Sequence, residues 1–204
     1  MKKLNSGDII DVPKCLANER VVILDTETTG FDRVKNRVIE FGAIWIDQGK
    51  LVTDYSKVLN PECELPQNII DLTGIQQCEV DQAEPFSSIA EFVVDLIEYP
   101  SVVVAYNSSF DLSFLRHEIE RAGLKMPRIG HVIDPLKWVR HADQGMKCSL
   151  SAAAERRGIT VEGAHRALAD CYMTVAVMNT LTMPESLLDV IETQKKIGFN
   201  KVRK

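Results

Sequence analysis

Short apolar runs alternate with polar turns in the first third of the chain, which predicts strands there. Residues 20–28 (RVVILDTET) form a β-branched run typical of a buried strand. Residues 37–60 predict two more strands, because their side chains alternate in character and the turn-forming segment 47–50 divides the stretch. Residues 101–107 (SVVVAYN) predict a fourth buried strand, and residues 131–140 predict a short fifth strand followed by a turn. The first three strands are expected to form a meander.

Helical periodicity lies between and after the later strands. Residues 84–98 place apolar side chains on one helical stripe. Residues 109–123 predict an amphipathic helix that ends at a glycine, and residues 148–158 predict a helix with Ser149 as its N-cap. Residues 165–181 predict the last strong helix. Three consecutive strands, followed by strands that alternate with helices, indicate an α/β domain whose mixed sheet is covered by helices on its faces.

A length of 204 residues fits one domain with a substantial core. We expect a single domain over residues 1–182 and a C-terminal extension or tail over residues 183–204. The last ten residues, 195–204, carry five basic side chains and no acidic one. Two interpretations of this basic end stay open: a solvated terminus, or a contact to a phosphate backbone or a polymerase-type partner.

Composition argues against several classes of protein. Hydrophobic residues make up 45% of the chain and charged residues 26%, as in soluble globular proteins. Apolar runs are short and the N-terminus lacks the apolar stretch of a secretory signal, so we expect no membrane span and a cytoplasmic location. The five cysteines contain no CxxC pair and the four histidines lack zinc-binding spacing. The net charge of −5 does not exclude nucleic acid, because a metal site concentrates acids that bound cations neutralise.

The motif DTETTG at 25–30 follows directly on the first apolar run. Side chains at i and i+2 of a strand share a face, so Asp25 and Glu27 are expected side by side. A hard cation such as Mg²⁺ would relieve their mutual repulsion. Taken alone, the motif also fits a solvated strand end, or the strand-end DxDxT motif of the aspartate-nucleophile phosphatases.

Three later residues are candidate partners for these acids. Asp111 falls in the first turn of a predicted helix, where it could serve the helix start or a site at the edge of the sheet. His165 and Asp170 are five residues apart, about 140° around a helix. Both can serve one site only if His165 lies in the loop or first turn that precedes Asp170. Considered singly, each residue also suits a purely structural role.

Together these motifs resemble those of the DEDDh 3′–5′ exonucleases, the DnaQ-like family that includes the proofreading subunit of bacterial DNA polymerase III. The resemblance rests on DTETTG at 25–30, AYNSSFD at 105–111 and HRALAD at 165–170, in the family's order. It extends over residues 20–181 and implies a ribonuclease H-like fold, with a five-stranded mixed sheet of a three-strand meander and two parallel strands. Tyr106 departs from the family, in which many members have histidine, and this leaves the subfamily open.

The resemblance also implies a chemical role for individual residues. Asp25, Glu27 and Asp170 would hold one Mg²⁺ or Mn²⁺, and Asp25 would bridge to a second ion supported by Asp111. His165 would be the general base that deprotonates the attacking water. The reaction would release nucleoside 5′-monophosphates from a 3′ end. Substrate contacts are expected from seven further residues: Thr28, Thr29, Gly30, Leu72, Thr73, Asn107 and Phe110.

The alternatives differ in how well they fit. A phosphatase is disfavoured because the chain has no DD pair, and its single GD precedes the first strand. A non-catalytic nucleic-acid-binding or protein-binding module is disfavoured because all five chemical positions are filled. The expected substrate is the 3′ end of single-stranded nucleic acid, with DNA favoured; a 3′-end trimming exoribonuclease stays open. A DNA polymerase subunit is a candidate partner, and the basic loop 31–37 is either a backbone contact or a solvated hairpin.

Overall fold

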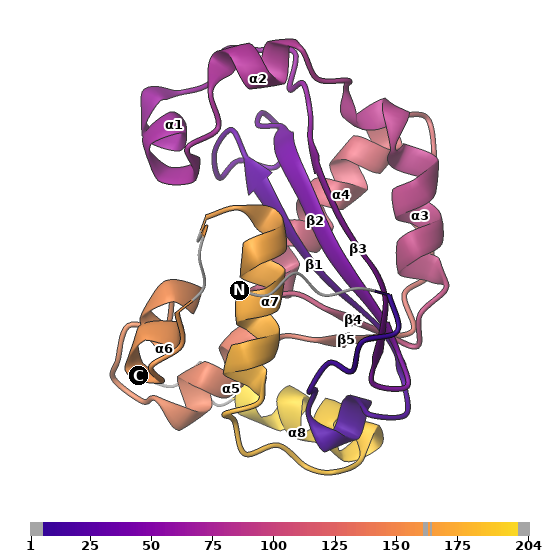
Figure 1. The fold of residues 1–204 in the computed structure, drawn as a ribbon, viewed down its shortest axis with the longest axis vertical. Coiled ribbons are helices and arrows are strands. Elements are labelled where there is room, and N and C mark those ends of the chain that lie inside the picture. The colour runs from indigo at the N-terminus through magenta and orange to yellow at the C-terminus, as the bar shows by residue number, and fades with distance from the viewer. Residues whose placement is uncertain (1–5, 161–162, 164, 200–204) are drawn as a thin grey trace.

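The computed structural model of the chain describes residues 6–160, 163 and 165–199 (Figure 1). Its centre is a five-stranded sheet in the order β3-β2-β1-β4-β5. β1 pairs antiparallel with β2 and β2 with β3, whereas β4 pairs parallel with both β1 and β5. This arrangement confirms the predicted meander followed by two parallel strands. The strands are β1 (Arg20–Thr28), β2 (Val38–Asp47), β3 (Lys50–Val58), β4 (Val102–Val104) and β5 (His131–Ile133).

Helices cover both faces of this sheet (Figure 1). α3 and α4 pack on one face, where Val22 and Leu24 of β1 belong to the same buried cluster. α7 and α8 pack on the other face, together with Val21 and Ile23. The alternation along β1 therefore supplies both cores at once. The helices and 3₁₀ turns are η1 (Lys14–Leu16), α1 (Gln67–Thr73), α2 (Gln77–Asp81), η2 (Phe86–Ser88), α3 (Ala90–Glu98), α4 (Ser108–Arg121), α5 (Pro135–Ala142), α6 (Leu150–Arg156), α7 (Ala167–Met178) and α8 (Leu187–Phe199).

Two predicted segments differ in detail from the structure. The first predicted helix is divided into η2 and α3 at Ile89, whose φ of −120° and ψ of 1° are not helical. The turn predicted after the fifth strand is the start of α5. Asp134 caps this helix by accepting the Leu136 N–H at 3.1 Å, and Pro135 occupies the first helical position, where no N–H is needed.

The C-terminal segment 183–204 contains α8, which packs against the domain. Val190 of α8 is fully buried in the core cluster that it shares with α7. Gln194 accepts the Asp134 N–H at 2.7 Å and donates to the Val132 carbonyl at 3.0 Å. Of the five basic residues in 195–204, Lys195 and Lys196 belong to α8, whereas Lys201, Arg203 and Lys204 lie outside the described residues. Among the described helices, none is long and apolar enough to cross a membrane.

Candidate active site

β1 carries two acidic side chains near its C-terminal end. Asp25 lies opposite Gly42 of β2 in the antiparallel ladder, and Glu27 lies opposite Glu40. As residues i and i+2 of one strand, the two acids point to the same face of the sheet. This is the face covered by α7, because a Cβ atom added to Gly42 would lie only 2.5 Å from the Ala167 carbonyl carbon. The strand register therefore aims both acids at the start of α7.

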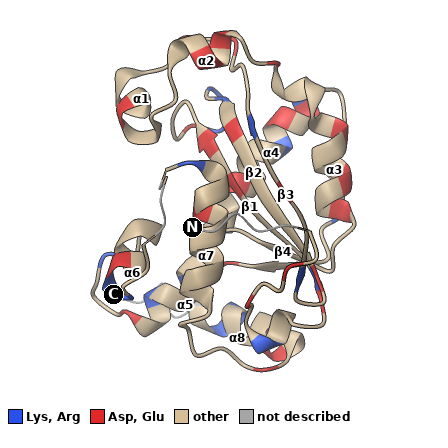
Figure 2. Ribbon diagram, in the orientation of Figure 1, with Lys and Arg blue, Asp and Glu red and all other residues tan. Residues whose placement is uncertain are grey.

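Asp170, in the first turn of α7, completes an acidic trio. Carboxylate oxygens from Asp25, Glu27 and Asp170 all lie within 4.8 Å of one another, and all three side chains are half-buried. Figure 2 shows the same grouping, with acidic positions on β1 and near the start of α7. Oxygen atoms at such spacing can converge on one hard divalent cation.

Asp111 lies beside this trio, in the first turn of α4, and is only 2% exposed. Its Oδ1 atom accepts hydrogen bonds from the Thr26 N–H at 3.0 Å and the Thr26 hydroxyl at 2.8 Å. Thr26 stands between Asp25 and Glu27 on β1. The bonds therefore tie the start of α4 to the stretch of strand that carries the two acids, a contact that sequence reasoning missed.

Burial raises the pKa of each of these four acids, and repulsion from a neighbouring carboxylate adds to it. Burial, followed by the charges of Asp111 and Asp170, raises the pKa of Asp25 well above its ordinary value of 3.8. Burial, followed by the charge of Asp170, raises the pKa of Glu27 to about 8. Burial raises the pKa of Asp111 to about 7 despite its bonds from Thr26, and it also raises the pKa of Asp170. Four carboxylates so placed are costly to ionise together without a cation.

The donor set therefore fits a divalent metal ion. Among the described residues, no hydrogen-bond donor reaches the side-chain oxygens of Asp25 or Glu27. Their lone pairs are free to coordinate a cation, whose charge would offset both the desolvation and the repulsion. Carboxylate-only oxygen ligands suit Mg²⁺ or Mn²⁺ rather than a soft metal.

His165 lies in the loop before α7, while Asp170 lies within the helix, which is the arrangement that their spacing requires. The backbone is left-handed at Gly163, with φ of 79°, and at His165, with φ of 67°. The His165 N–H donates to Asp170 Oδ1 at 3.2 Å. The histidine backbone is therefore tied to one of the three clustered acids.

Three of the residues expected to contact substrate, Thr28, Thr29 and Gly30, lie at the end of β1 and the start of the loop that follows it. Thr28 and Thr29 are both buried. The Thr28 hydroxyl donates to the Gly30 carbonyl at 2.7 Å, and the Thr29 hydroxyl accepts the Arg37 N–H at 2.9 Å. Their side chains therefore shape the loop, and a contact to substrate from this stretch would fall to its backbone.

The remaining expected contacts lie on α1 and at the start of α4. Leu72 of α1 is 47% exposed, whereas Thr73 is buried and donates its hydroxyl to the Ile69 carbonyl at 2.9 Å. Asn107 is exposed and left-handed, with φ of 71°, just before α4. Leu72 and Asn107 are thus accessible to a ligand, while the Thr73 side chain serves the end of its own helix.

A cavity of about 430 Å³ separates the loop after β1 from the start of α4. Phe31 of this loop is 83% exposed and meets Phe110 edge-on, with ring centroids 6.3 Å apart. Sequence reasoning missed Phe31, although an aromatic residue in a basic loop was a usable signal. The cavity is lined by Phe31, Asp32, Arg33, Val34, Asn107, Ser109, Phe110 and Ser113.

Two buried ion pairs beside the site were also missed by sequence reasoning. Glu40 of β2 and Glu118 of α4 are each 1% exposed. Glu40 binds Arg166, which is 126 residues away, and Glu118 binds Arg37, which is 81 residues away. Each glutamate lies in a segment with apolar periodicity, and no local pattern identifies a partner so distant in sequence.

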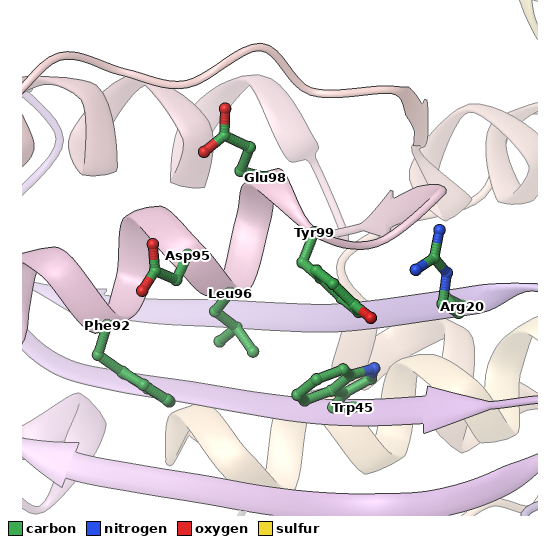
Figure 3. A pocket seen from close by; sticks show the side chains of 7 residues that line it. All are labelled: Arg20, Trp45, Phe92, Asp95, Leu96, Glu98 and Tyr99. Atoms are coloured by element: carbon green, nitrogen blue, oxygen red, sulfur yellow. The ribbon is translucent and has the colours of Figure 1, made fainter.

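A second hollow, shown in Figure 3, is lined by Arg20 at the start of β1, whereas Asp25 and Glu27 lie near the other end of that strand. This groove of about 680 Å³ runs between α3 and β2. Figure 3 shows Phe92, Leu96 and Tyr99 of α3 turned toward the sheet, with Tyr99 beside Trp45 of β2. Four of its seven lining residues are aromatic or aliphatic, and its two carboxylates, Asp95 and Glu98, do not belong to the acidic trio.

Comparisons with known proteins identify a matching family model and similar proteins. Residues 22–178 match the model of a family described as exonuclease (RNase_T). The chain is 32% identical over 158 residues to the 3′–5′ exonuclease DinG of Bacillus subtilis (strain 168), covering 76% of this chain and 17% of DinG. It is also 32% identical to the PolC-type DNA polymerase III of Thermotoga petrophila, covering 91% of this chain and 13% of that protein. The chain thus spans less than a fifth of these two relatives.

A third relative is similar in length, and solved structures share the fold. The chain is 32% identical to the DNA polymerase III subunit epsilon of Rickettsia felis, covering 82% of this chain and 76% of that protein. E. coli exonuclease I in complex with a dA16 oligonucleotide superposes with a TM-score of 0.69 at 21% identity, over 80% of this chain and 41% of that one. Exonuclease X in complex with 5′ overhanging duplex DNA gives 0.61 at 25% identity, over 85% and 99%. The expected ribonuclease H-like fold is confirmed.

Proposed function

The chain belongs to the DEDDh, or DnaQ-like, family of 3′–5′ exonucleases, and from this premise we propose that it removes nucleotides from the 3′ ends of single-stranded nucleic acid, with DNA favoured. The observation that carries the proposal is the acidic trio of Asp25, Glu27 and Asp170, whose oxygens lie within 4.8 Å of one another. A binding module of the same fold would have no need of three half-buried carboxylates with raised pKa values. The products would be nucleoside 5′-monophosphates.

In this proposal the acids hold two divalent cations, Mg²⁺ or Mn²⁺. Asp25, Glu27 and Asp170 would bind the first, and Asp25 together with Asp111 would bind the second. Bound there, the cations would stabilise the charge that develops on the attacked phosphodiester. The bonds from Thr26 keep Asp111 beside β1, so the ligands come from β1, α4 and α7 in one preorganised set.

His165 would act as the general base that takes a proton from the attacking water. Imidazole is a common general base in enzymes, and the backbone bond of His165 to Asp170 keeps this residue beside the acids. Replacing His165 by alanine is expected to lower kcat by roughly 10²–10⁴-fold while Mn²⁺ binding is retained. A variant with the full wild-type kcat would remove His165 from the base role.

The proposed substrate contacts come from the end of β1 and the loop that follows it, from α1 and from the start of α4. Phe31 and Phe110 border the cavity of about 430 Å³ and would stack against a nucleobase. The backbone of residues 28–30 and the exposed side chains of Leu72 and Asn107 would meet the terminal nucleotide. DNA is favoured over RNA because the relatives named above include two DNA polymerase III proteins. Association with a DNA polymerase subunit is proposed on the same ground.

The decisive experiment compares 3′-labelled and 5′-labelled oligonucleotides of one sequence as single-stranded DNA, single-stranded RNA and duplex DNA with a 5′ overhang. With Mg²⁺ or Mn²⁺ present, the 5′-labelled DNA is expected to shorten stepwise, and the 3′ label to leave as a mononucleotide. EDTA should stop the reaction, and added metal should restore it. Asp25→Asn is the matched inactive control. Internal cuts, or no reaction with any substrate, would contradict the proposal, and faster loss of RNA would select the exoribonuclease alternative.

A further inference from the structure

In addition to Asp111, the carboxylate of Glu40 lies beside the acidic trio, but its oxygens are already bound by other groups. Glu40 lies opposite Glu27 in the β1–β2 ladder and is 1% exposed. Its Oε2 atom accepts from Arg166 Nε at 3.0 Å, and its Oε1 atom accepts from Arg166 Nη2 at 2.9 Å. The Ser56 hydroxyl also donates to Oε1, at 2.9 Å. Such a two-point pairing of carboxylate and guanidinium fixes both position and orientation.

The same carboxylate also binds the backbone at the start of α7. Glu40 Oε2 accepts the Ala167 N–H at 3.0 Å, and Ala167 is the first residue of the helix. The residue in the N-cap position is Arg166, whose side chain makes no capping hydrogen bond of its own. A buried carboxylate at a helix N-terminus satisfies a free N–H and favours the helix dipole. Glu40 therefore caps α7 from a neighbouring strand.

A second contact from β2 fixes the same turn of the helix. Gly42 follows Glu40 by two residues and so faces the same side of the sheet. A Cβ atom added there would lie 2.5 Å from the Leu168 nitrogen and 2.9 Å from the Ala167 Cβ. The backbone of β2 and the first residues of α7 are thus in direct contact. Glu40 and Gly42 together locate the helix start on the strand adjacent to β1.

Glu40 binds Arg166 and Ala167, and the residues proposed to take part in the reaction lie on either side of them. His165 precedes Arg166 in a left-handed conformation, and Asp170 follows three residues after Ala167. The contacts of Glu40 and Gly42 fix the first turn of α7 against β2. A rotation of the helix start would move the Asp170 carboxylate away from Asp25 and Glu27.

We propose that Glu40 is a positioning residue that, through Arg166 and the Ala167 N–H, holds Asp170 and His165 in register with Asp25 and Glu27. The inference rests on the proposed function, in which these residues bind metal and move a proton. Glu40 itself touches neither substrate nor cation in this account. Its effect on the reaction is transmitted through the placement of α7.

The test uses Glu40→Gln in the full chain, because glutamine keeps the shape and one acceptor but loses the charged pairing with Arg166. The expected result is a 10- to 100-fold loss of Mn²⁺ affinity, measured by titration calorimetry, with a similar loss of kcat. The KM for a single-stranded DNA oligonucleotide should stay within about threefold, since the loop after β1 is untouched. Ser56→Ala is the matched control: it removes one bond to Glu40 and leaves the Arg166 pairing, so Mn²⁺ affinity and kcat should stay near wild type.

A purely structural role would give a different result. If Glu40→Gln lowers the melting temperature but keeps wild-type Mn²⁺ affinity and kcat, the positioning role is overturned. Should this variant not fold, Arg166→Lys provides the second test, because lysine keeps the charge but cannot pair at two points. An unchanged Mn²⁺ affinity in that variant would equally overturn the proposal. If the wild type hydrolyses no substrate, the proposed function fails by itself, and the Mn²⁺ titrations still decide whether Glu40 positions the acids.

Discussion

Glu40 and Glu118 are two buried glutamates of similar construction that serve opposite sides of the acidic cluster. Each is 1% exposed, and each is paired with an arginine at two points. Each also accepts a backbone N–H at the start of another element, Ala167 of α7 for Glu40 and Val38 of β2 for Glu118. The two differ in what they hold in place.

Glu118 holds the loop between β1 and β2, whereas Glu40 holds the helix that carries Asp170. Arg37 closes this loop, and it donates to Glu118 from Nε at 2.8 Å and from Nη2 at 3.1 Å. Arg121 also binds Glu118, at 2.9 Å, and its other terminal nitrogen donates to the Val34 carbonyl at 2.6 Å within the loop. The fold therefore uses two buried pairs of the same kind, one to fix the helix that carries Asp170 and one to fix the loop that we propose contacts substrate.

The largest expected effect comes from removing one of the clustered acids that Glu40 positions. Asp170→Asn should lower kcat by on the order of a thousandfold or more, because a metal ligand is lost and not merely displaced. The loss should exceed that of Glu40→Gln by at least tenfold in the same labelled-oligonucleotide assay. Equal losses of kcat in the two variants would mean that Glu40 acts directly on the reaction and is not a positioning residue.

Glu118→Gln should have a smaller effect than Asp170→Asn, and it should change KM and not kcat. Weakening the bonds to Arg37 and Arg121 should loosen the loop, so KM for single-stranded DNA is expected to rise roughly tenfold. The value of kcat should remain within about threefold, because α7 and the acids are untouched. Steady-state kinetics on oligonucleotides measures both.

The control for this variant is Glu62→Gln. Glu62 also binds Arg37, at 3.0 Å, but its side chain is 63% exposed, so its loss should change KM less than twofold. A fall in kcat with unchanged KM in Glu118→Gln would contradict the assignment of this pair to the substrate side.

The acidic cluster should make the stability of the metal-free protein depend on pH. Burial, followed by the charge of Asp170, raises the pKa of Glu27 from 4.5 to about 8, so the folded protein binds more protons than the unfolded chain between these values. The free energy of unfolding of the metal-free protein should therefore decrease as the pH rises from 5 to 8. Melting curves in EDTA at several pH values should show this slope, and Asp25→Asn should reduce it.

Added Mn²⁺ should reverse this destabilisation, because the cation binds the ionised carboxylates. At a hundredfold excess over the dissociation constant, ligand binding adds about 2.7 kcal/mol, or roughly 5–10 °C in melting temperature for a chain of this size. The gain should be larger at pH 8 than at pH 6. A gain that is the same at both pH values would show that the bound metal does not contact Glu27 and its neighbours.

The positions of the acids could be predicted from the sequence because each depends on a local rule. Asp25 and Glu27 share a face by strand alternation, and Asp170 lies in the first turn after a loop that contains His165. The meander and the two later strands followed from the pattern along the chain, whereas the order β3-β2-β1-β4-β5 came from the structure alone. These features need only a few consecutive residues, and the family resemblance joined them into one site.

The contacts made by Glu40 and Asp111 could not be predicted from the sequence because they join segments that are distant along the chain. Glu40 occupies a place in an alternating strand where any residue would preserve the pattern, and its partner Arg166 lies 126 residues later. The bond between Asp111 and Thr26 likewise joins positions 85 residues apart. The helix α5 was different: Asp134 followed by Pro135 is a helix-start signal that sequence reasoning interpreted as a turn.

The smallest expected effect comes from a substitution in the groove between α3 and β2, which is lined by neither Glu40 nor Glu118. Phe92 is 40% exposed there and packs on Tyr55, with ring centroids 4.7 Å apart. Arg20 of this groove begins β1, five residues before Asp25, which is about 17 Å along a strand. Phe92→Ala should cost about 1–2 kcal/mol of stability and change kcat/KM by less than about twofold.

This small effect follows from how the acids are located. Asp25 and Glu27 take their positions from the ladder with β2, and the contacts that fix Asp170 are made by Glu40 and Gly42 at the far end of that strand. Loss of one ring from the groove leaves this register intact, so stability can fall without a change in kcat. A tenfold fall in kcat for Phe92→Ala would show that the groove end of the sheet also controls the register at the acids. Glu40 would then be one of several positioning contacts and not the principal one.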